Sequence, residues 1–364
     1  MSGVPGPGPP GPTAVGVFLA QARLQATRPF VHHHRDGRWQ EVSWIELREY
    51  GLRIASGLLD AGVEVGDRVL VLSENRLEWL ACELGIQMAG AVTVAVRPSA
   101  SPEAAQAIAR RSGVVLAVVS GEELAGGLHL TDVLGRIVRV DGEVARWLRA
   151  PFAGSSSEEV RRRLIGLGPD DVATVDFPQG TSPGVAVTHR DLVQQARGCI
   201  ETHGIGRTDR VLFFLRCANV SERLWGLLVP AGAGATVWLA RGIPHLDEDV
   251  QAARPTLIRC TPAVLAAIRH GAEEERRRWS GPRRGAAAWA IATGRERAGE
   301  PRPHLWLRLR HRLADRLVLS ALRRRAGGGR LRRFAIGETS LPAAVEDYFR
   351  AIGLPVRRGC GRER

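Results

Sequence analysis

The sequence contains no lysine, so all 51 of its lysine and arginine positions are arginine. This absence excludes any catalytic or phosphate-binding role for a lysine amine within these 364 residues. The use of arginine alone fits a basic binding surface and a GC-rich coding bias equally well, so it does not select a nucleic-acid partner. An apolar share of 44% is ordinary for a globular protein and argues against wholesale disorder.

Cysteine is scarce, and long apolar runs are missing. The five cysteines are scattered, with no C-x-x-C pair and no even framework, which predicts reduced thiols in a cytoplasmic protein. The uncharged, mainly apolar stretch 224–240 contains Pro230 and several glycines and falls short of the roughly 20 apolar residues of a membrane span. Residues 1–14 are rich in proline and glycine and lack a cationic and an apolar segment, so we expect a disordered leader and no signal peptide.

The positive charge is concentrated in one segment. Between Arg269 and Arg333 there are 19 arginines and six acidic residues, an excess that equals the formal net charge of +13. The aromatic residues inside this segment are Trp279, Trp289 and Trp306, too few to suggest interleaved nucleic-acid contacts. We therefore expect a solvated face or contact with an anionic membrane surface, and no specific nucleic acid.

Apolar runs alternate with helix signals in the first half of the chain. Ser43 and Glu46 have the spacing of a capping box, in which each side chain satisfies the other residue's backbone donor, so a helix is expected to begin there and to end near Gly62. Ser101 and Pro102 mark another helix start. Strands are expected at 68–72, 91–96 and 114–119, with a helix at 75–89. This alternation predicts parallel strands with right-handed crossovers.

The same alternation recurs in the second half. Thr188 is expected to cap a helix that reaches Gly204, after a loop at 177–184. Strands are expected at 172–176, 210–215, 235–239 and 256–260. Two doubly wound α/β subdomains, 15–165 and 166–364, are the simplest organisation, and one large Rossmann-like sheet is the alternative.

A series of short segments then follows in one order along the chain. They include Trp39–Trp44, Leu212–Leu215 and Glu222-Arg223, and no single one of the segments is decisive. The others are 62–69, 74–79, 90–94, 232–237, 254–256, 315–318 and 332–361. Together these segments resemble AMP-forming long-chain acyl-CoA synthetases, which are adenylate-forming enzymes, and the resemblance covers residues 17–361.

The resemblance implies an α/β fold: the large N-terminal domain of the adenylate-forming fold, made of two doubly wound parallel-sheet subdomains, with the C-terminal domain missing. It implies a reaction in which ATP activates a fatty acid as an acyl-adenylate and coenzyme A then takes the acyl group. ATP, Mg²⁺ and coenzyme A are the implied cofactors, and a fatty acid or other acyl compound is the implied substrate. We expect a cytoplasmic protein that can lie against the inner face of the membrane.

The phosphate-binding loop is where the sequence departs from the resemblance. The family pattern is roughly YTSGTTG-x-PKG, ending in T-H, whereas residues 177–189 read FPQGTSPGVAVTH. Three positions, including the lysine, are deleted, and Pro178 lacks a backbone N–H. Glycine in such a loop allows backbone N–H groups to approach phosphate oxygens. The residues that still align as nucleotide-binding positions are Gly180, Thr181, Ser182 and Gly184.

The adenine-side motifs are also altered. The family's Gly-Gly-Ala turn corresponds to Gly337-Glu338-Thr339, which brings a carboxylate toward the nucleotide. The YGLTE motif is reduced to Gly359-Cys360-Gly361 and the residues after it. Glu363 aligns with the metal-ligating acid if one deletion is allowed, and is otherwise a frayed terminal residue.

Histidines and a capping residue offer further candidates. His32, His33 and His34 are adjacent in an expected hairpin and cannot all face one metal ion, so we expect a solvated surface turn. His189 follows Thr188 and fits the first turn of a helix better than a catalytic base. Asn219 stands where the family commonly has histidine, beside the acyl entrance.

The sequence therefore predicts an AMP-binding, fatty-acid–CoA-ligase-like chain with weak or absent activity. The family's ribose-binding aspartate, hinge and C-terminal domain with its catalytic lysine do not occur in these residues. Three alternatives stay open. The chain is a residual enzyme completed by a separate C-terminal partner, a non-catalytic acyl- or nucleotide-binding module, or a degenerated gene product.

Overall fold

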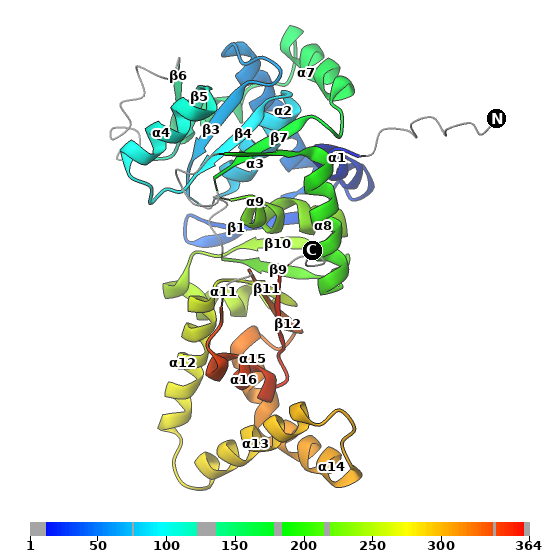
Figure 1. Ribbon diagram of the computed structural model, residues 1–364, viewed down its shortest axis with the longest axis vertical. Coiled ribbons are helices and arrows are strands. Elements are labelled where there is room, and N and C mark those ends of the chain that lie inside the picture. The colour runs from blue at the N-terminus through cyan, green and yellow to red at the C-terminus, as the bar shows by residue number, and fades with distance from the viewer. Residues whose placement is uncertain are drawn as a thin grey trace, which may run out of the picture. The chain divides into compact units, whose positions relative to one another are not determined.

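The computed structural model describes residues 12–74, 76–121, 136–177, 184–214, 219–337 and 340–359. These residues form an α/β structure with two sheets (Figure 1). Unit 1 comprises residues 1–33, 40–200 and 216–234, and unit 2 comprises residues 34–39, 201–215 and 235–364. The predicted division between residues 165 and 166 falls inside unit 1.

The six-stranded sheet of unit 1 has the order β6-β5-β3-β4-β7-β8. Five of its strands run parallel to one another, and β8 runs antiparallel to β7. The strands are β3 (Arg68–Leu72), β4 (Val92–Val96), β5 (Val114–Val119), β6 (Arg136–Arg139), β7 (Val172–Asp176) and β8 (Val185–Thr188). The parallel part agrees with the predicted doubly wound sheet, whereas the β8 strand was not predicted.

Helices precede, connect and follow these strands. They are α1 (Ala14–Leu24), α2 (Trp44–Asp60), α3 (Leu77–Met88), α4 (Pro102–Ser112), α6 (Ala145–Trp147), α7 (Ser155–Gly166), α8 (His189–His203), α9 (Val220–Arg223) and α10 (Val229–Ala233), with π-helical turns η2 (Val140–Val144) and η3 (Leu224–Leu228). The predicted capping box opens α2, because the Ser43 side chain accepts from Glu46 N and the Glu46 carboxylate accepts from Ser43 N. The predicted helix start at Ser101 and Pro102 is likewise confirmed.

The seven-stranded sheet has the order β13-β12-β11-β9-β10-β1-β2. The pairs from β13 to β10 along this order are parallel. The strands are β1 (Pro29–Arg35), β2 (Arg38–Ser43), β9 (Arg210–Phe213), β10 (Thr236–Leu239), β11 (Leu257–Arg259), β12 (Arg333–Ile336) and β13 (Val356–Arg358). The helices of unit 2 are α11 (Leu246–Ala253), α12 (Pro262–Arg278), α13 (Pro282–Gly299), α14 (Leu305–Ala314), α15 (Ser320–Gly327) and α16 (Ala343–Ala351), with a 3₁₀ turn η4 (Ile243–His245) and a π-helical turn η5 (Asp315–Leu319).

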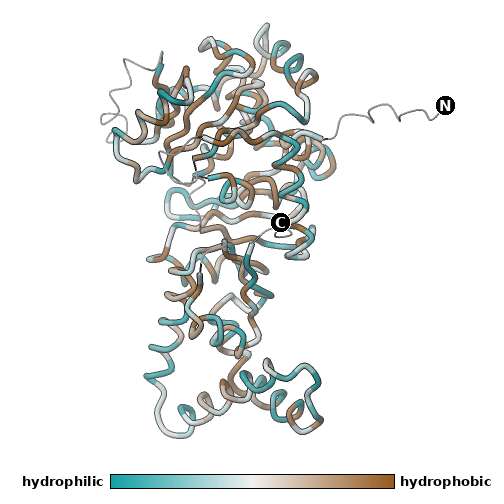
Figure 2. The backbone as a smooth tube through the Cα atoms, in the orientation of Figure 1, coloured by the Kyte–Doolittle hydropathy of each residue, from teal (hydrophilic) through white to brown (hydrophobic). Residues whose placement is uncertain are grey.

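Each unit has its own apolar core, and Figure 2 shows apolar residues along the strands. In unit 1, Leu70, Val94 and Val119 from neighbouring strands pack with Ile108 of α4. In unit 2, the Phe334 and Phe349 rings meet edge to face with centroids 4.7 Å apart. Burial of such side chains is the main stabilising contribution, at roughly 1.5–3 kcal/mol for each large apolar residue.

Two expectations about individual side chains were wrong. His32 and His33 lie in strand β1 and are buried, so they do not form a solvated turn. Cys199 is disulfide-bonded, whereas the scattered spacing of the cysteines predicted reduced thiols throughout. Cys82 and Cys260 are free and buried, as predicted for reduced thiols.

Helices α2 and α3 pack closely at Gly85. A Cβ atom added there would lie 2.5 Å from Ile54 Cγ2 and 3.0 Å from the Gly51 carbonyl oxygen. We therefore expect Gly85→Ala to lower the free energy of unfolding by about 1–3 kcal/mol through overpacking. Gly166→Ala is the matched control, because a Cβ atom there meets nothing within 4 Å. Urea unfolding checks both, and equal stability of the two variants would contradict the close packing.

Candidate functional site

The β7–β8 hairpin carries the described part of the predicted phosphate loop. Gly180, Thr181 and Ser182 lie outside the described residues. Gly184 directly precedes β8, and a Cβ atom there would lie 2.7 Å from both Phe177 Cζ and Val175 Cγ1. Glycine at this position therefore allows the returning strand to approach β7 closely.

The end of β7 is tied to the start of α9. The Asp176 carboxylate accepts from Val220 N at 3.2 Å, and the Asn219 side chain accepts from Glu222 N at 2.9 Å. Asn219, expected beside an acyl entrance, therefore acts as the N-cap of this short helix. Asp176 was not predicted as a site residue, although a carboxylate at the carboxyl end of a parallel strand is a usable signal.

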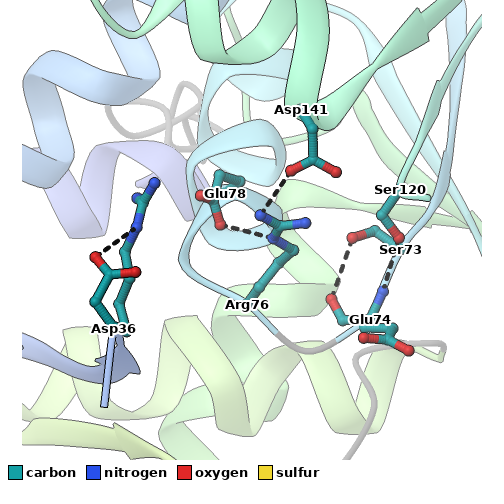
Figure 3. Close-up of polar contacts among 8 residues, drawn as sticks. Asp36, Ser73, Glu74, Arg76, Glu78, Ser120 and Asp141 are labelled. Atoms are coloured by element: carbon teal, nitrogen blue, oxygen red, sulfur yellow. Dashed lines mark hydrogen bonds and ion pairs between the residues drawn. The ribbon is translucent and has the colours of Figure 1, made fainter. Parts of the chain in front are cut away.

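Described residues of the resembling segment 74–79 form a polar cluster near the carboxyl ends of β3 and β5 (Figure 3). Arg76 donates to Glu78 at 2.8 Å and to Asp141 at 3.0 Å. The Ser120 hydroxyl accepts from Glu74 N at 3.4 Å. Because these side chains bind one another, their described contacts are structural, connecting the loop after β3 with the segments that follow β5 and β6.

A buried ion pair joins α3 to α9. Glu83 and Arg223 are each 5% exposed at the side chain, with Arg223 Nη1 3.5 Å from Glu83 Oε1. Gln87 donates to Glu83 at 2.8 Å, Arg223 donates to the Thr174 hydroxyl at 2.5 Å, and Thr174 donates to the Thr93 carbonyl at 2.7 Å. The network therefore connects two helices with strands β7 and β4 inside unit 1.

A small cavity adjoins this ion pair. Phe18, Leu84, Leu192 and Leu227 supply apolar walls, and Glu83 is among its polar lining residues. Its volume of about 20 Å³ has room for about one water molecule. The cavity is therefore too small for a fatty acyl chain.

His189 is the first residue of α8, as predicted. It is 1% exposed, and its Nδ1 accepts a hydrogen bond from Ala14 N at 3.3 Å. Burial lowers the pKa of His189 to about 4, which Asp171 opposes in part. The imidazole is therefore neutral at pH 7 and holds the start of α1.

This burial predicts a pH-dependent stability. Between pH 6.5 and pH 4 the unfolded chain binds a proton at His189 that the folded chain does not, so stability present at neutral pH is lost as the pH falls. We expect about 2 kcal/mol of loss from this residue between pH 7 and pH 5. His189→Asn keeps an acceptor near the Nδ1 position and should remove that part of the pH dependence in urea titrations. An unchanged pH dependence in the variant would contradict the assignment.

In unit 2, the two adenine-side glycines lie next to each other. Gly337 follows β12 and Gly359 follows β13, and these strands pair in parallel. Gly359 N donates to the Ile336 carbonyl at 3.2 Å. Glu338, Thr339, Cys360, Gly361 and Glu363 lie outside the described residues. The structure thus brings together the described ends of two motifs that are more than 20 residues apart in sequence.

Basic side chains gather beside these strand ends. His203 is fully buried, and its Nε2 lies 3.0 Å from the Gly359 carbonyl oxygen. Burial lowers the pKa of His203, and Arg259, Arg333 and Arg357 lower it further against the opposing hydrogen bond with Gly359. The pKa of Arg333 is also lowered, first by burial and then by Arg357 and Arg332. This concentration of positive charge would attract an anion.

These basic residues were not predicted as a group from the sequence. The strand register places Arg259 and Arg357 level with Ala335, so both project from the same face of the sheet. A Cβ atom on Gly337 would lie 3.7 Å from Arg259 Nη2. Arginines at the ends of neighbouring strands were a visible signal, but their convergence depends on strand order.

Two kinds of feature are absent from the described residues. No group of three or more histidine, cysteine, aspartate or glutamate side chains there has a geometry that could hold a metal ion. None of the described helices combines the length and the apolar character that crossing a bilayer requires.

The chain resembles known proteins along nearly its whole length. A sequence model described as AMP-binding enzyme matches residues 18–360. The long-chain-fatty-acid–CoA ligase FadD15 of Mycobacterium tuberculosis is 29% identical over 342 residues, which is 90% of this chain and 56% of FadD15. The chain thus spans about half the length of this relative. A fatty acyl-CoA synthetase A of Dictyostelium discoideum is 23% identical, over 90% of this chain and 51% of that protein.

Solved structures agree on the fold. A long-chain-fatty-acid–CoA ligase, FadD1, from Archaeoglobus fulgidus superimposes with a TM-score of 0.71 at 16% identity, covering 98% of this chain and 65% of that chain. The N-terminal domain of FACL13 from Mycobacterium tuberculosis gives a TM-score of 0.70 at 16% identity, covering 97% of this chain and 76% of that chain. At these identities the likeness establishes the fold alone.

Proposed function

Because the chain belongs to the AMP-binding enzyme family, as a relative of AMP-forming acyl-CoA synthetases, we propose that it is a fatty-acid–CoA-ligase-like protein with very weak or no ligase activity on its own. The family reaction converts ATP, fatty acid and coenzyme A into acyl-CoA, AMP and diphosphate. The single observation that carries the proposal is the segment 177–189, which is three positions shorter than the family loop and has no lysine. We infer that adenine nucleotide and acyl substrate are its ligands.

The change in the loop is expected to weaken binding of the phosphates of ATP rather than binding of its adenosine. A lysine would add a positive charge near the triphosphate, and hydrogen bonds to charged groups contribute about 1.5–3 kcal/mol each. Pro178 removes a further backbone donor, and Glu338 adds negative charge near the nucleotide. Loss of one such contact corresponds to roughly 10–100-fold in affinity.

The adenosine side is supported by the strand ends of unit 2. Gly337 and Gly359 lie side by side, and the nearby Arg259 and Arg357 supply positive charge for a single phosphate. Gly180, Thr181, Ser182 and Gly184 remain the proposed contacts for the remaining phosphates. Thr339, Cys360 and Gly361 complete the proposed nucleotide set, and Glu363 is the proposed Mg²⁺ ligand. Coenzyme A is the co-substrate that the family reaction would require.

The missing phosphate donors of the loop predict an unusual order of nucleotide affinities. We expect ATP with Mg²⁺ to bind no more tightly than AMP, with a Kd of about 1 mM or weaker, because the added phosphates meet too few donors. Isothermal titration of the 364-residue chain with each nucleotide measures this.

A loop-restored variant sharpens the test. Inserting three residues that include a lysine into 177–189 should tighten ATP binding at least 10-fold and leave AMP binding unchanged. The same insertion with alanine in place of lysine is the matched control. A low-micromolar Kd for ATP in the unaltered chain would contradict the proposal.

The basic segment is the second part of the proposal. We infer that the region from Arg269 to Arg333 meets an anionic membrane surface, which would place the protein in the cytoplasm and against the inner face of the membrane. Its charge excess and the lipid substrates named for the relatives support this inference. A fatty acid delivered from such a surface would be the acyl substrate.

A further inference from the structure

One continuous helical segment of unit 2 exposes a row of large apolar side chains. Helix α14 runs into η5, and both pack inward through Leu307, Ala314 and Val318, which are buried. Both elements contact α13. In Figure 1, α13 and α14 lie at the end of unit 2 that is remote from β9 and β10. The inward face of this segment is therefore buried, and its outward face is exposed to solvent.

The outward face is apolar at every fourth position. Leu305, Leu309, Leu313 and Leu317 are exposed by 72%, 47%, 52% and 61%, and Trp306 beside them by 67%. Residues four apart lie on one side of a helix, so these side chains form one stripe. A row of five large, exposed apolar side chains on one side of a helix indicates a surface that binds a partner. We call these five residues the α14 stripe.

A row of arginines lies directly beside the α14 stripe. Arg308, Arg312 and Arg316 are exposed and also four residues apart. No carboxylate of the described residues forms an ion pair with any of the three. By contrast, Arg310 pairs with Glu296, and Arg323 pairs with Asp315 at 2.6 Å. The segment therefore presents three uncompensated positive charges alongside its apolar side chains. Hydrophilic and hydrophobic residues alternate along this part of the backbone in Figure 2.

This combination selects one kind of partner. An apolar stripe flanked by arginines is the pattern of helices that lie in the interface of an anionic bilayer, with tryptophan at the level of the headgroups. Nucleic acid would use the arginines but would leave the leucines and Trp306 in water. A second copy of the chain would bury the leucines but would bring the arginine rows of two like-charged faces together. Only an anionic lipid surface uses both rows.

We propose that the α14 stripe enters the headgroup region of an anionic lipid bilayer while Arg308, Arg312 and Arg316 contact lipid phosphates. The proposal rests on the membrane contact inferred above for the region from Arg269 to Arg333 and assigns it to one helix face. It requires neither nucleotide nor fatty acid. Lipid binding can therefore be measured without any ligase substrate, and its absence would be distinguishable from an error in the proposed function.

Vesicle co-sedimentation tests the proposal. The 364-residue chain should bind vesicles of 70% phosphatidylcholine and 30% phosphatidylglycerol at low salt, and bind pure phosphatidylcholine vesicles far less. Each arginine near an anionic surface increases the affinity for that surface roughly 5-fold. The triple variant R308Q/R312Q/R316Q should therefore bind the anionic vesicles about 100-fold more weakly. The matched control is R283Q/R284Q/R295Q, which removes three exposed arginines of α13 and should bind almost normally.

The apolar row is tested separately. Leu309→Gln with Leu313→Gln should lower vesicle binding at least 10-fold, whereas Ile165→Gln, at an 87% exposed position outside this helix, should not. All these side chains are exposed, so the folded state should persist, as circular dichroism would verify. Equal binding to neutral vesicles, or normal binding by either α14 variant, would overturn the proposal. Loss of self-association in the leucine variant without loss of lipid binding would assign the face to a second copy instead.

Discussion

Replacing Glu83 with leucine is expected to lower the free energy of unfolding by about 3–5 kcal/mol. The glutamate and Arg223 are both 5% exposed, and removal of the carboxylate leaves the guanidinium charge buried without its ion-pair partner. The Thr174 hydroxyl, which also accepts from Arg223, cannot neutralise this charge. Urea unfolding of the purified variant measures the loss.

The double variant E83L/R223M separates the charge from the packing. It replaces both ions with apolar side chains, so most of the stability should return. Asp170→Leu is the control for an exposed pair, because Asp170 and Arg190 are largely in solvent, and it should cost no more than about 1 kcal/mol. If Glu83→Leu and Asp170→Leu have equal effects, the buried pair does not have the role assigned to it.

The 364-residue chain is expected to form acyl-CoA at least 10⁴-fold more slowly than a typical enzyme turnover of about 10 s⁻¹. Removal of one transition-state contact of the electrostatic kind costs roughly 10²–10³ in rate. The segment 177–189 lacks two such contacts, because the lysine of the family loop is absent and Pro178 has no backbone N–H. The assay contains ATP, Mg²⁺, coenzyme A and palmitate, with thioester formation followed by mass spectrometry.

A long-chain-fatty-acid–CoA ligase such as FadD15 serves as the positive control for that assay. Heat-denatured chain gives the background. Turnover within 10-fold of the positive control would show that the shortened loop and the missing lysines do not limit the chemistry. Turnover only in the loop-restored variant would locate the defect in residues 177–189.

Strands and helices with strong local signals were predictable. Residues 68–72, 114–119 and 172–176 form strands at the predicted bounds, because each is a short run of mainly apolar residues between polar or turn residues. Helix α8 begins directly after Thr188, which accepts from Asp191 N at 3.1 Å in the predicted capping position. In these cases the residues of the segment itself were sufficient to predict its secondary structure.

Features that depend on distant partners were not predictable. Glu83 and Arg223 are 140 positions apart, and nothing near either residue indicates that they meet. The burial of His32 and His33 follows from their place in a strand of the seven-stranded sheet rather than from their own polarity. The bonded state of Cys199 likewise depends on spatial proximity that scattered spacing cannot reveal.

The candidate site was predictable in part. Gly337 and Gly359 were chosen from motif resemblance, and the structure places them on adjacent strand ends. The surrounding basic residues escaped notice because Arg259 and Arg357 lie on separate strands that neighbour β12 on either side. Asn219 was interpreted by its position in a motif, whereas its observed hydrogen bond is that of a helix cap.

The most direct test of the account is palmitate-dependent exchange of labelled pyrophosphate into ATP by the 364-residue chain. Exchange reports adenylate formation itself and needs no coenzyme A. We expect no exchange above the protein-free background in the unaltered chain, because we propose that the shortened loop binds the triphosphate too weakly. Rapid exchange, on the order of 10 s⁻¹, would contradict the proposal that this chain is a ligase-like protein without effective fatty-acid activation.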